Sequence, residues 1–180
     1  MSPNLRYWSE RRGHFHKNTC ITLNDINKSK STLIMLLSRQ ILPEHLRLEY
    51  KQSCYDIIGC IHYVHKTLGP AMVEYVYQEA LYKALLKKGY NVVKEYNHHP
   101  VFDGQPLKSS IQMDMVVFRP EGNVIIECKS IVDIGDREQM QTFGYLCGTQ
   151  FPYAIIANFG TYPKAQVERY HFENNSISAF

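Results

Sequence analysis

Three charged side chains occur in a part of the chain that otherwise has the composition of a protein core. Residues 111–129 are predicted to form two apolar strands joined by a tight turn at residues 119–123. Asp114 falls in the middle of the first strand, and Glu127 and Lys129 fall on the second. Two carboxylates and a lysine that converge in this way are what a hard divalent cation and its water need. The sequence therefore predicts a divalent-cation site on this hairpin.

The alternation of side chains along a strand decides which of these residues can meet. Glu127 and Lys129 are two residues apart and should point to the same face, whereas Cys128 should point to the other. A hairpin would bring Asp114 beside Glu127 on the neighbouring strand. Cys128, which has no obvious histidine partner, is expected to be a core thiol rather than a nucleophile.

Two amphipathic helices precede the hairpin. Apolar residues near helical spacing predict a long helix over residues 44–68, and residues 71–88 have the clearest helical pattern, with Pro70 expected at the first helical position. Glu74 falls at one edge of the apolar face of this second helix. It either faces a polar cleft or is a helix N-terminal glutamate favoured by the helix dipole, and the pattern favours neither.

The remaining elements alternate between the two types. After strands or hairpin arms at residues 91–96 and 101–102, Asp103 and Gly104 are expected to turn the chain. Residues 137–146 are predicted to form a further amphipathic helix, and residues 153–159 and 167–172 two further strands. The order helix, three strands, helix, strand, strand predicts a mixed α/β domain with the carboxylates on its middle strands.

The bulk composition bounds the class of protein. At 180 residues, 44% hydrophobic and 21% charged, the chain suits one globular domain with an extension. No apolar run is long enough to span a membrane, and the N-terminus has no apolar segment typical of a signal peptide. The five cysteines form no C-x-x-C pair, so we expect reduced thiols in a cytoplasmic protein.

The net charge of +3 is distributed unevenly. Residues 1–66 carry ten Lys and Arg against five Asp and Glu, whereas residues 67–180 carry ten against twelve. The part with the predicted site is thus slightly acidic. Charge alone does not indicate a nucleic-acid-binding protein, because phosphate binding is usually accompanied by a clear basic patch.

Other clusters carry less weight. His14, His16 and Cys20 match no established zinc spacing, and His62 with His65 on the first long helix more often indicates solvated or capping residues than a metal site. The triplet that ends at Lys51 is an acid-x-Lys pattern of a kind expected about once by chance. Signature motifs of serine hydrolases, P-loop proteins and zinc proteases are absent from the sequence.

An ordered set of short motifs resembles a known family. The set resembles the PD-(D/E)XK nuclease fold and, more closely, the small bacterial GxxExxY proteins of that superfamily, over about residues 55–172. Ala71 stands where the naming glycine of that family would be, and Met113 precedes Asp114 where the superfamily label has proline. The motifs are Leu68-Gly69-Pro70, Glu74-Tyr75-Val76-Tyr77, Glu79-Ala80-Leu81, Asp114, Ile125-Ile126-Glu127-Cys128-Lys129, Gln141, Tyr145-Leu146 and Ile156-Ala157-Asn158-Phe159-Gly160.

The resemblance implies a fold and a role for each site residue. It implies a restriction-endonuclease-like core over residues 51–175, with residues 1–50 as an N-terminal arm with short helices. By the family pattern, Asp114, Glu127 and the Cys128 main-chain carbonyl hold Mg²⁺ (or Mn²⁺), with Glu74 contacting the metal directly or through water. Lys129 would orient or activate the attacking water and stabilise charge on the phosphate. Gln141 would steady the lysine or the substrate.

Three hypotheses remain open from the sequence. The first is a metal-dependent nuclease that hydrolyses the phosphodiester bonds of DNA or, less expectedly, RNA. The second is a non-catalytic binding module on the same scaffold, which could act as a homodimer or with a protein partner because a small domain often needs help to hold nucleic acid. The third is a structural salt-bridge network, a poor way to stabilise a core compared with apolar residues.

Overall fold

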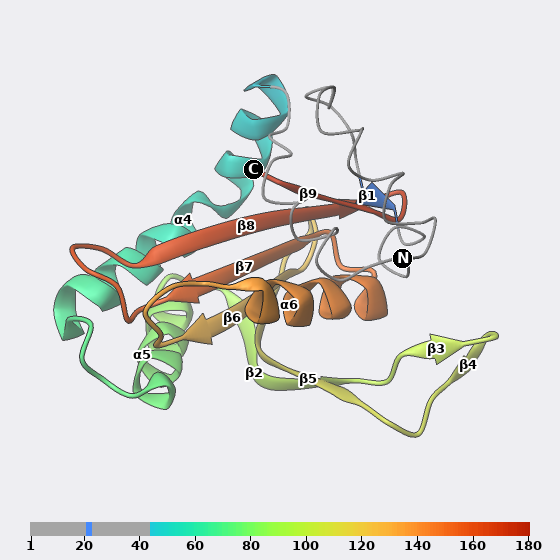
Figure 1. Cartoon of the computed structure of the whole chain (residues 1–180), viewed down its shortest axis with the longest axis horizontal. Helices are drawn as coiled ribbons and strands as arrows, with labels where there is room; N and C mark the ends of the chain where they lie inside the picture. Colours follow the sequence, from blue (N-terminus) through green and yellow to red (C-terminus); the bar gives the residue numbers. More distant parts are fainter. Residues whose placement is uncertain (1–20, 23–43) are drawn as a thin grey trace, which may run out of the picture.

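The computed structural model describes residues 21–22 and 44–180. Within these ranges the chain forms a seven-stranded sheet in the order β1-β9-β8-β7-β6-β5-β2, a separate two-stranded ribbon, and three helices (Figure 1). Of the predicted N-terminal arm with short helices over residues 1–50, the structure describes only residues 21–22 and 44–50, and the cluster of His14, His16 and Cys20 lies outside the described residues. The elements are β1 (Ile21–Thr22), α4 (Glu44–Leu68), α5 (Glu74–Lys87), β2 (Asn91–His98), β3 (Val101–Phe102), β4 (Gln105–Pro106), β5 (Ile111–Phe118), β6 (Val124–Lys129), α6 (Asp136–Thr149), β7 (Tyr153–Asn158), β8 (Gln166–Glu173) and β9 (Ser176–Ala179).

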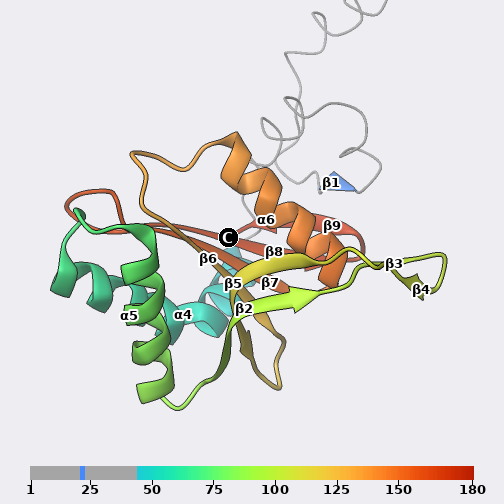
Figure 2. The ribbon, with the colours of Figure 1, turned by 90° about the horizontal axis from the view of Figure 1, so that it is seen from below.

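The sheet separates two hydrophobic cores. Helices α4 and α5 cover one face and α6 covers the other (Figure 2). Strand β6 supplies both cores, since Val124, Ile126 and Cys128 pack toward α4 and α5 while Ile125 packs toward α6. A strand that is apolar on both faces belongs in the centre of such a sandwich. This mixed α/β arrangement confirms the predicted fold class.

Helix α4 begins and ends where the apolar periodicity predicts. Its buried face includes Cys54, Ile57, Ile61 and Val64, which recur at three- and four-residue spacing.

Cys54, Cys60, Cys128 and Cys147 are free thiols. Among the described residues, no helix is both long and apolar enough to cross a membrane.

Helix α5 begins three residues later than the sequence predicts. The expectation that Pro70 starts the helix is wrong, because the main chain here bonds to a side chain from the helix itself. The Tyr77 hydroxyl donates to the Gly69 carbonyl and accepts the N–H of Met72 at 3.0 Å. Val73 is extended and acts as the N-cap, so the first helical residue is Glu74.

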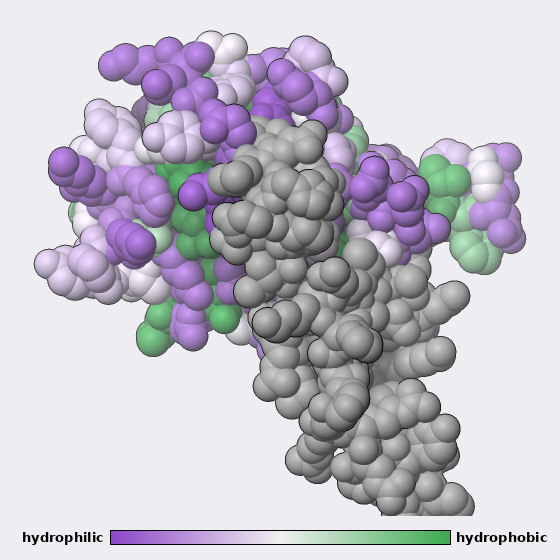
Figure 3. Space-filling view, turned by 90° about the horizontal axis from the view of Figure 1, so that it is seen from above, coloured by the Kyte–Doolittle hydropathy of each residue, from purple (hydrophilic) through white to green (hydrophobic). Residues whose placement is uncertain are grey.

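A narrow two-stranded ribbon extends from the end of the molecule opposite to α5 (Figure 1). Strands β3 and β4 pair with each other around a turn in which Asp103 and Gly104 both have positive φ, as the sequence predicts for this dipeptide. Figures 1 and 2 show the ribbon projecting beyond the sheet, and Figure 3 shows hydrophobic side chains near its tip. Val101 and Phe102 are the exposed apolar residues of β3.

The C-terminal part of the sheet is larger than predicted. Helix α6 and strands β7 and β8 match the predicted elements in type and approximate position. The prediction that β8 is the last strand is wrong, since β9 follows and pairs with it. Asn174 and Asn175 both have positive φ between these strands. A two-residue turn of this kind is a strong hairpin connection, and the sequence signal for it was overlooked.

Candidate active site

The hairpin of β5 and β6 brings Asp114 and Glu127 together. The main-chain ladder between these strands ends at the pair Met115 and Ile126, and one further step along each strand leads to Asp114 and Glu127. At that point a side chain replaces the ladder, since the Cys128 N–H donates to Asp114 Oδ2 at 2.8 Å. The carboxylate of Asp114 is therefore held against the main chain of β6, beside Glu127.

The alternation of β5 breaks at Asp114. Met113 packs in the core beneath α6, whereas Met115 packs in the core beneath α4 and α5, although residues two apart on a regular strand share a face. Opposite this point on β2, Glu95 has a positive φ of 54°. A local irregularity of this kind can re-aim a side chain. It occurs where the candidate carboxylate lies.

Lys129 and Glu127 form a close, buried ion pair. Lys129 Nζ lies 2.8 Å from Glu127 Oε1, with exposed side-chain fractions of 14% and 3%. Glu127 Oε2 is buried and has no hydrogen-bond partner in the part of the chain that the structure describes. A buried carboxylate oxygen normally has a partner. This oxygen is therefore a buried acceptor whose hydrogen-bonding capacity is unused within the described chain.

The site is crowded with negative charge. Burial and, to a smaller extent, the nearby Asp114 together raise the pKa of Glu127 from 4.5 to about 7, against the opposing effect of Lys129. Burial likewise raises the pKa of Asp114. Burial alone would lower the pKa of Lys129, but its bond to Glu127 and the surrounding carboxylates raise it overall. Lys129 thus faces carboxylates, Glu127 and Asp114 among them, whose pKa values are raised.

Helix α5 contributes two side chains from its first turns. Glu74 is half-buried, burial raises its pKa, and the charge of Lys129 lowers it while that of Asp114 raises it. Glu74 therefore lies within electrostatic reach of the hairpin, which agrees with a polar-cleft position. Gln78, one turn later, lies near Asp114 and lowers its pKa against the larger effect of burial. The sequence reasoning missed Gln78, although its four-residue spacing from Glu74 puts it on the same helix face.

Helix α6 contributes from the opposite face of the sheet. Gln141 Nε2 donates to the Tyr145 hydroxyl at 2.7 Å, so in this structure Gln141 contacts Tyr145 rather than Lys129. Tyr145 is buried, and its pKa is raised by burial and by the charge of Glu127. Tyr145 was not among the predicted site residues. Its spacing of four from Gln141 was the available signal.

Strand β7 fixes the direction in which the chain leaves Lys129. The Phe159 N–H donates to the Lys129 carbonyl at 2.8 Å. Buried Asn158 accepts the N–H groups of Ile131 and Gly160, each at 3.0 Å. A Cβ atom on Gly160 would lie 2.4 Å from the Ile131 carbonyl oxygen, so only glycine fits there. These contacts lock the end of β6 in place.

The weaker candidates have structural roles or remain unsupported. His65 is buried and its Nε2 lies 2.7 Å from the Thr161 carbonyl oxygen, which accounts for its position without a metal. Lys51 lies on α4 and not on a strand. Within residues 44–180 no group of three His, Cys, Asp or Glu side chains is arranged as a ready-made metal site. Mg²⁺, however, requires only one or two carboxylates with waters and substrate oxygens.

The oxygen donors at this site fit a Mg²⁺ or Mn²⁺ ion. Asp114 and Glu127 offer carboxylate oxygens, and one of them, Glu127 Oε2, is buried without a partner among the described residues. Oxygen donors of this kind suit Mg²⁺ or Mn²⁺.

A comparison with sequence models of known families identifies the superfamily of the chain. A sequence model of the PD-(D/E)XK nuclease superfamily matches residues 51–170, and the chain belongs to that superfamily. The fold is accordingly of the restriction-endonuclease-like type. A solved structure titled "Crystal structure of SSO0001" is similar at 16% identity and a TM-score of 0.42, over 92% of this chain and 73% of that one. No curated protein matches.

Proposed function

We propose that this protein is a Mg²⁺-dependent nuclease that hydrolyses phosphodiester bonds, with DNA as the first substrate to test and RNA as the second. The observation that carries the proposal is the state of Glu127. One carboxylate oxygen is bound by Lys129 and the other is buried without a partner in the described chain, beside a second carboxylate at Asp114. A site of this composition is costly as a structural device, since buried charges stabilise poorly.

The proposed ligands are Asp114, Glu127 and the main-chain carbonyl of Cys128, with Glu74 contacting the ion directly or through water. The raised pKa values of the three carboxylates support this assignment, because a divalent cation would offset the cost of burying their charge. When bound, the ion would neutralise charge on the scissile phosphate and lower the pKa of a coordinated water.

The remaining residues orient these groups. Lys129 holds Glu127 and can donate its other hydrogens to the attacking water or to a phosphate oxygen. The Cys128 N–H holds Asp114, and Gln78 lies near the same carboxylate. Gln141, which is exposed and bonded to Tyr145, is available to the substrate.

We further propose that the chain belongs to the GxxExxY group. Glu74 and Tyr77 occupy the last two positions of that pattern, and each has a distinct physical role. Glu74 faces the carboxylate site, whereas Tyr77 stacks on Phe159 at 4.6 Å and ties the preceding loop through Gly69. The two residues together connect the start of α5 to the end of β7.

We also propose a cytoplasmic location, which the free thiols at the four described cysteines support.

A non-catalytic binding module, alone, as a homodimer or with a protein partner, is the alternative. The near balance of charge over residues 67–180, with ten basic and twelve acidic residues, favours it. Failure of Mg²⁺ to bind at millimolar concentration would support this alternative over the nuclease.

The decisive test combines metal binding with cleavage. Calorimetric titration with Mg²⁺ or Mn²⁺ should give binding to the wild type and none to Asp114→Asn combined with Glu127→Gln, which preserve side-chain shape. Plasmid, single-stranded and branched DNA, and RNA, are then assayed for cleavage. Asp114→Asn and Lys129→Met should each reduce cleavage by at least about a hundredfold.

The matched control is Asp103→Asn, since Asp103 is an exposed aspartate on the β3–β4 turn. It should cleave like the wild type. Unchanged metal-dependent cleavage by folded Asp114→Asn would refute the proposal.

A further inference from the structure

Three loops meet at the end of the sheet where β6 finishes. We define these loops, together with the first two residues of α5, as the loop rim, residues 70–75, 130–135 and 160–164. They are tied to one another, since Ser130 Oγ donates to the Met72 carbonyl at 2.8 Å and Gly160 packs against the main chain of Ile131. Figures 1 and 2 both show these loops at one end of the molecule, away from the β3–β4 ribbon. The loop rim therefore borders Lys129.

The loop rim exposes large apolar and aromatic side chains. Val132 is 92% exposed, Tyr162 85% and Tyr75 68%, and Met72 and Val73 are exposed as well. Tyr75 directly follows Glu74, and Val132 lies three residues after Lys129. Exposed apolar groups that gather beside a polar site mark a binding surface more often than scattered ones do.

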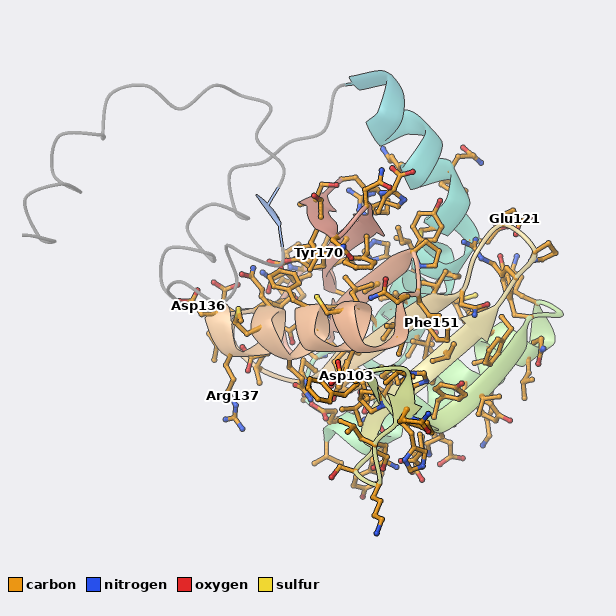
Figure 4. All side chains as sticks on the ribbon, turned by 90° about the vertical axis from the view of Figure 1, so that its right-hand side faces the viewer. Asp103, Glu121, Asp136, Arg137, Phe151 and Tyr170 are labelled. Carbon is orange, nitrogen blue, oxygen red and sulfur yellow. The ribbon has the colours of Figure 1, made fainter. Side chains whose placement is uncertain are left out.

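The charges on and around the rim are mixed. Lys66 and Lys164 are exposed, and the charge of Lys164 contributes to the lowered pKa of His62, so Lys164 lies near the end of α4. Arg137, on the first turn of α6, extends away from the helix into solvent (Figure 4). Asp133 and Asp136 are exposed among these cations. A surface with so small a positive excess is poorly suited to binding a duplex through its phosphates alone.

Aromatic rings at such a surface favour a different ligand. The bases of a duplex are stacked on each other and cannot meet protein side chains, whereas unpaired bases can stack on tyrosine. We propose that the loop rim binds unpaired nucleotides of the substrate, with Tyr162 and Tyr75 as stacking platforms and Lys164 contacting phosphate. This inference rests on the proposed function, because it places the scissile phosphate at Lys129. The preferred substrate is then single-stranded nucleic acid or an unpaired segment next to a duplex.

The test is binding of fluorescently labelled oligonucleotides to the full chain, followed by anisotropy. Binding is measured in Ca²⁺, a hard cation with looser geometry than Mg²⁺, for a single strand and for the duplex of the same sequence. Tyr162→Ala should weaken single-strand binding about 5- to 150-fold, the loss of one stacked base. Tyr162→Phe, which keeps the ring, should bind like the wild type.

Tyr55→Ala is the matched control. Tyr55 is a tyrosine of 61% exposure on α4, about ten residues before the end of that helix that contacts the rim. It should leave binding unchanged. Equal affinity of the wild type for single strand and duplex, or equal losses in Tyr162→Ala and Tyr55→Ala, would overturn the inference.

Cleavage assays separate the two proposals. If Asp114→Asn abolishes cleavage while Tyr162→Ala binds normally, the nuclease stands and the stacking inference fails. If Tyr162→Ala loses single-strand binding while no substrate is cleaved by the wild type, the inference stands and the nuclease fails. A Tyr162→Ala variant that changes only the oligomeric state would also overturn the inference, in favour of a second copy on the rim.

Discussion

The buried carboxyl group of Glu127 should make the metal-free protein less stable as pH rises. Its pKa is about 7 in the folded state against an ordinary value of 4.5, because burial and Asp114 oppose its ionisation. Between these pH values the folded state binds more protons than the unfolded state. The contribution of Glu127 to stability is therefore greatest below about pH 4.5, falls as pH rises toward 7, and levels off above it.

The size of this effect follows from the same two values. At 1.36 kcal/mol per pH unit, the difference between 4.5 and about 7 corresponds to about 3 kcal/mol. Burial also raises the pKa of Asp114, which adds to the effect with the same sign. Lys129 titrates above this window, since its pKa is raised from 10.5. Glu127→Gln removes the titrating group and keeps its shape.

The assay is urea unfolding in EDTA at a series of pH values from 5 to 8. Relative to the wild type, Glu127→Gln should gain about 2.5 kcal/mol between the two ends of the series, or roughly 5–10 °C in Tm. Glu79→Gln is the control, because Glu79 is exposed and pairs with Lys83 on the surface of α5. Addition of Mg²⁺ should flatten the wild-type curve. The same pH dependence in wild type and Glu127→Gln would refute the reasoning.

Two further substitutions test the framework around the site. Gly160→Ala should destabilise the protein by about 1–3 kcal/mol in urea unfolding, since its Cβ would lie 2.4 Å from the Ile131 carbonyl oxygen. Gly144→Ala, in α6 with no atom within 4 Å of the new Cβ, should instead be neutral or stabilise by up to about 1 kcal/mol; equal losses at both glycines would contradict the argument. Tyr77→Phe keeps the ring but loses the hydroxyl bond to Gly69, and should cost about 1–2 kcal/mol in thermal unfolding; an unchanged Tm would show that the hydroxyl is dispensable.

The hairpin could be predicted because its signals are local. The apolar runs on either side of the turn fix both strands, and the alternation along β6 correctly separates Glu127 from Cys128. The register of β5 and β6 then leads directly to Asp114 beside Glu127. These features depend on residues close together in the sequence.

The start of α5 and the break in β5 depend on tertiary contacts. Proline at position 70 is favourable for a helix start in isolation, but the Tyr77 hydroxyl competes for the main chain of the preceding loop. The departure of Met113 from the expected face involves packing against α6, far along the chain. Gln78 and Tyr145 could have been predicted as site residues, since each lies one helical turn after a predicted site residue, Glu74 or Gln141.

Strand β6 and strand β7 are parallel, unlike the other paired strands in the described part of the chain. A parallel pair needs a connection that returns to the starting edge, and α6 is that connection. Gln141 and Tyr145 therefore lie on an element that the topology itself demands. A deletion that removed them with their helix would also remove the means of forming β7, so selection for a folded sheet and selection for these side chains act on the same segment.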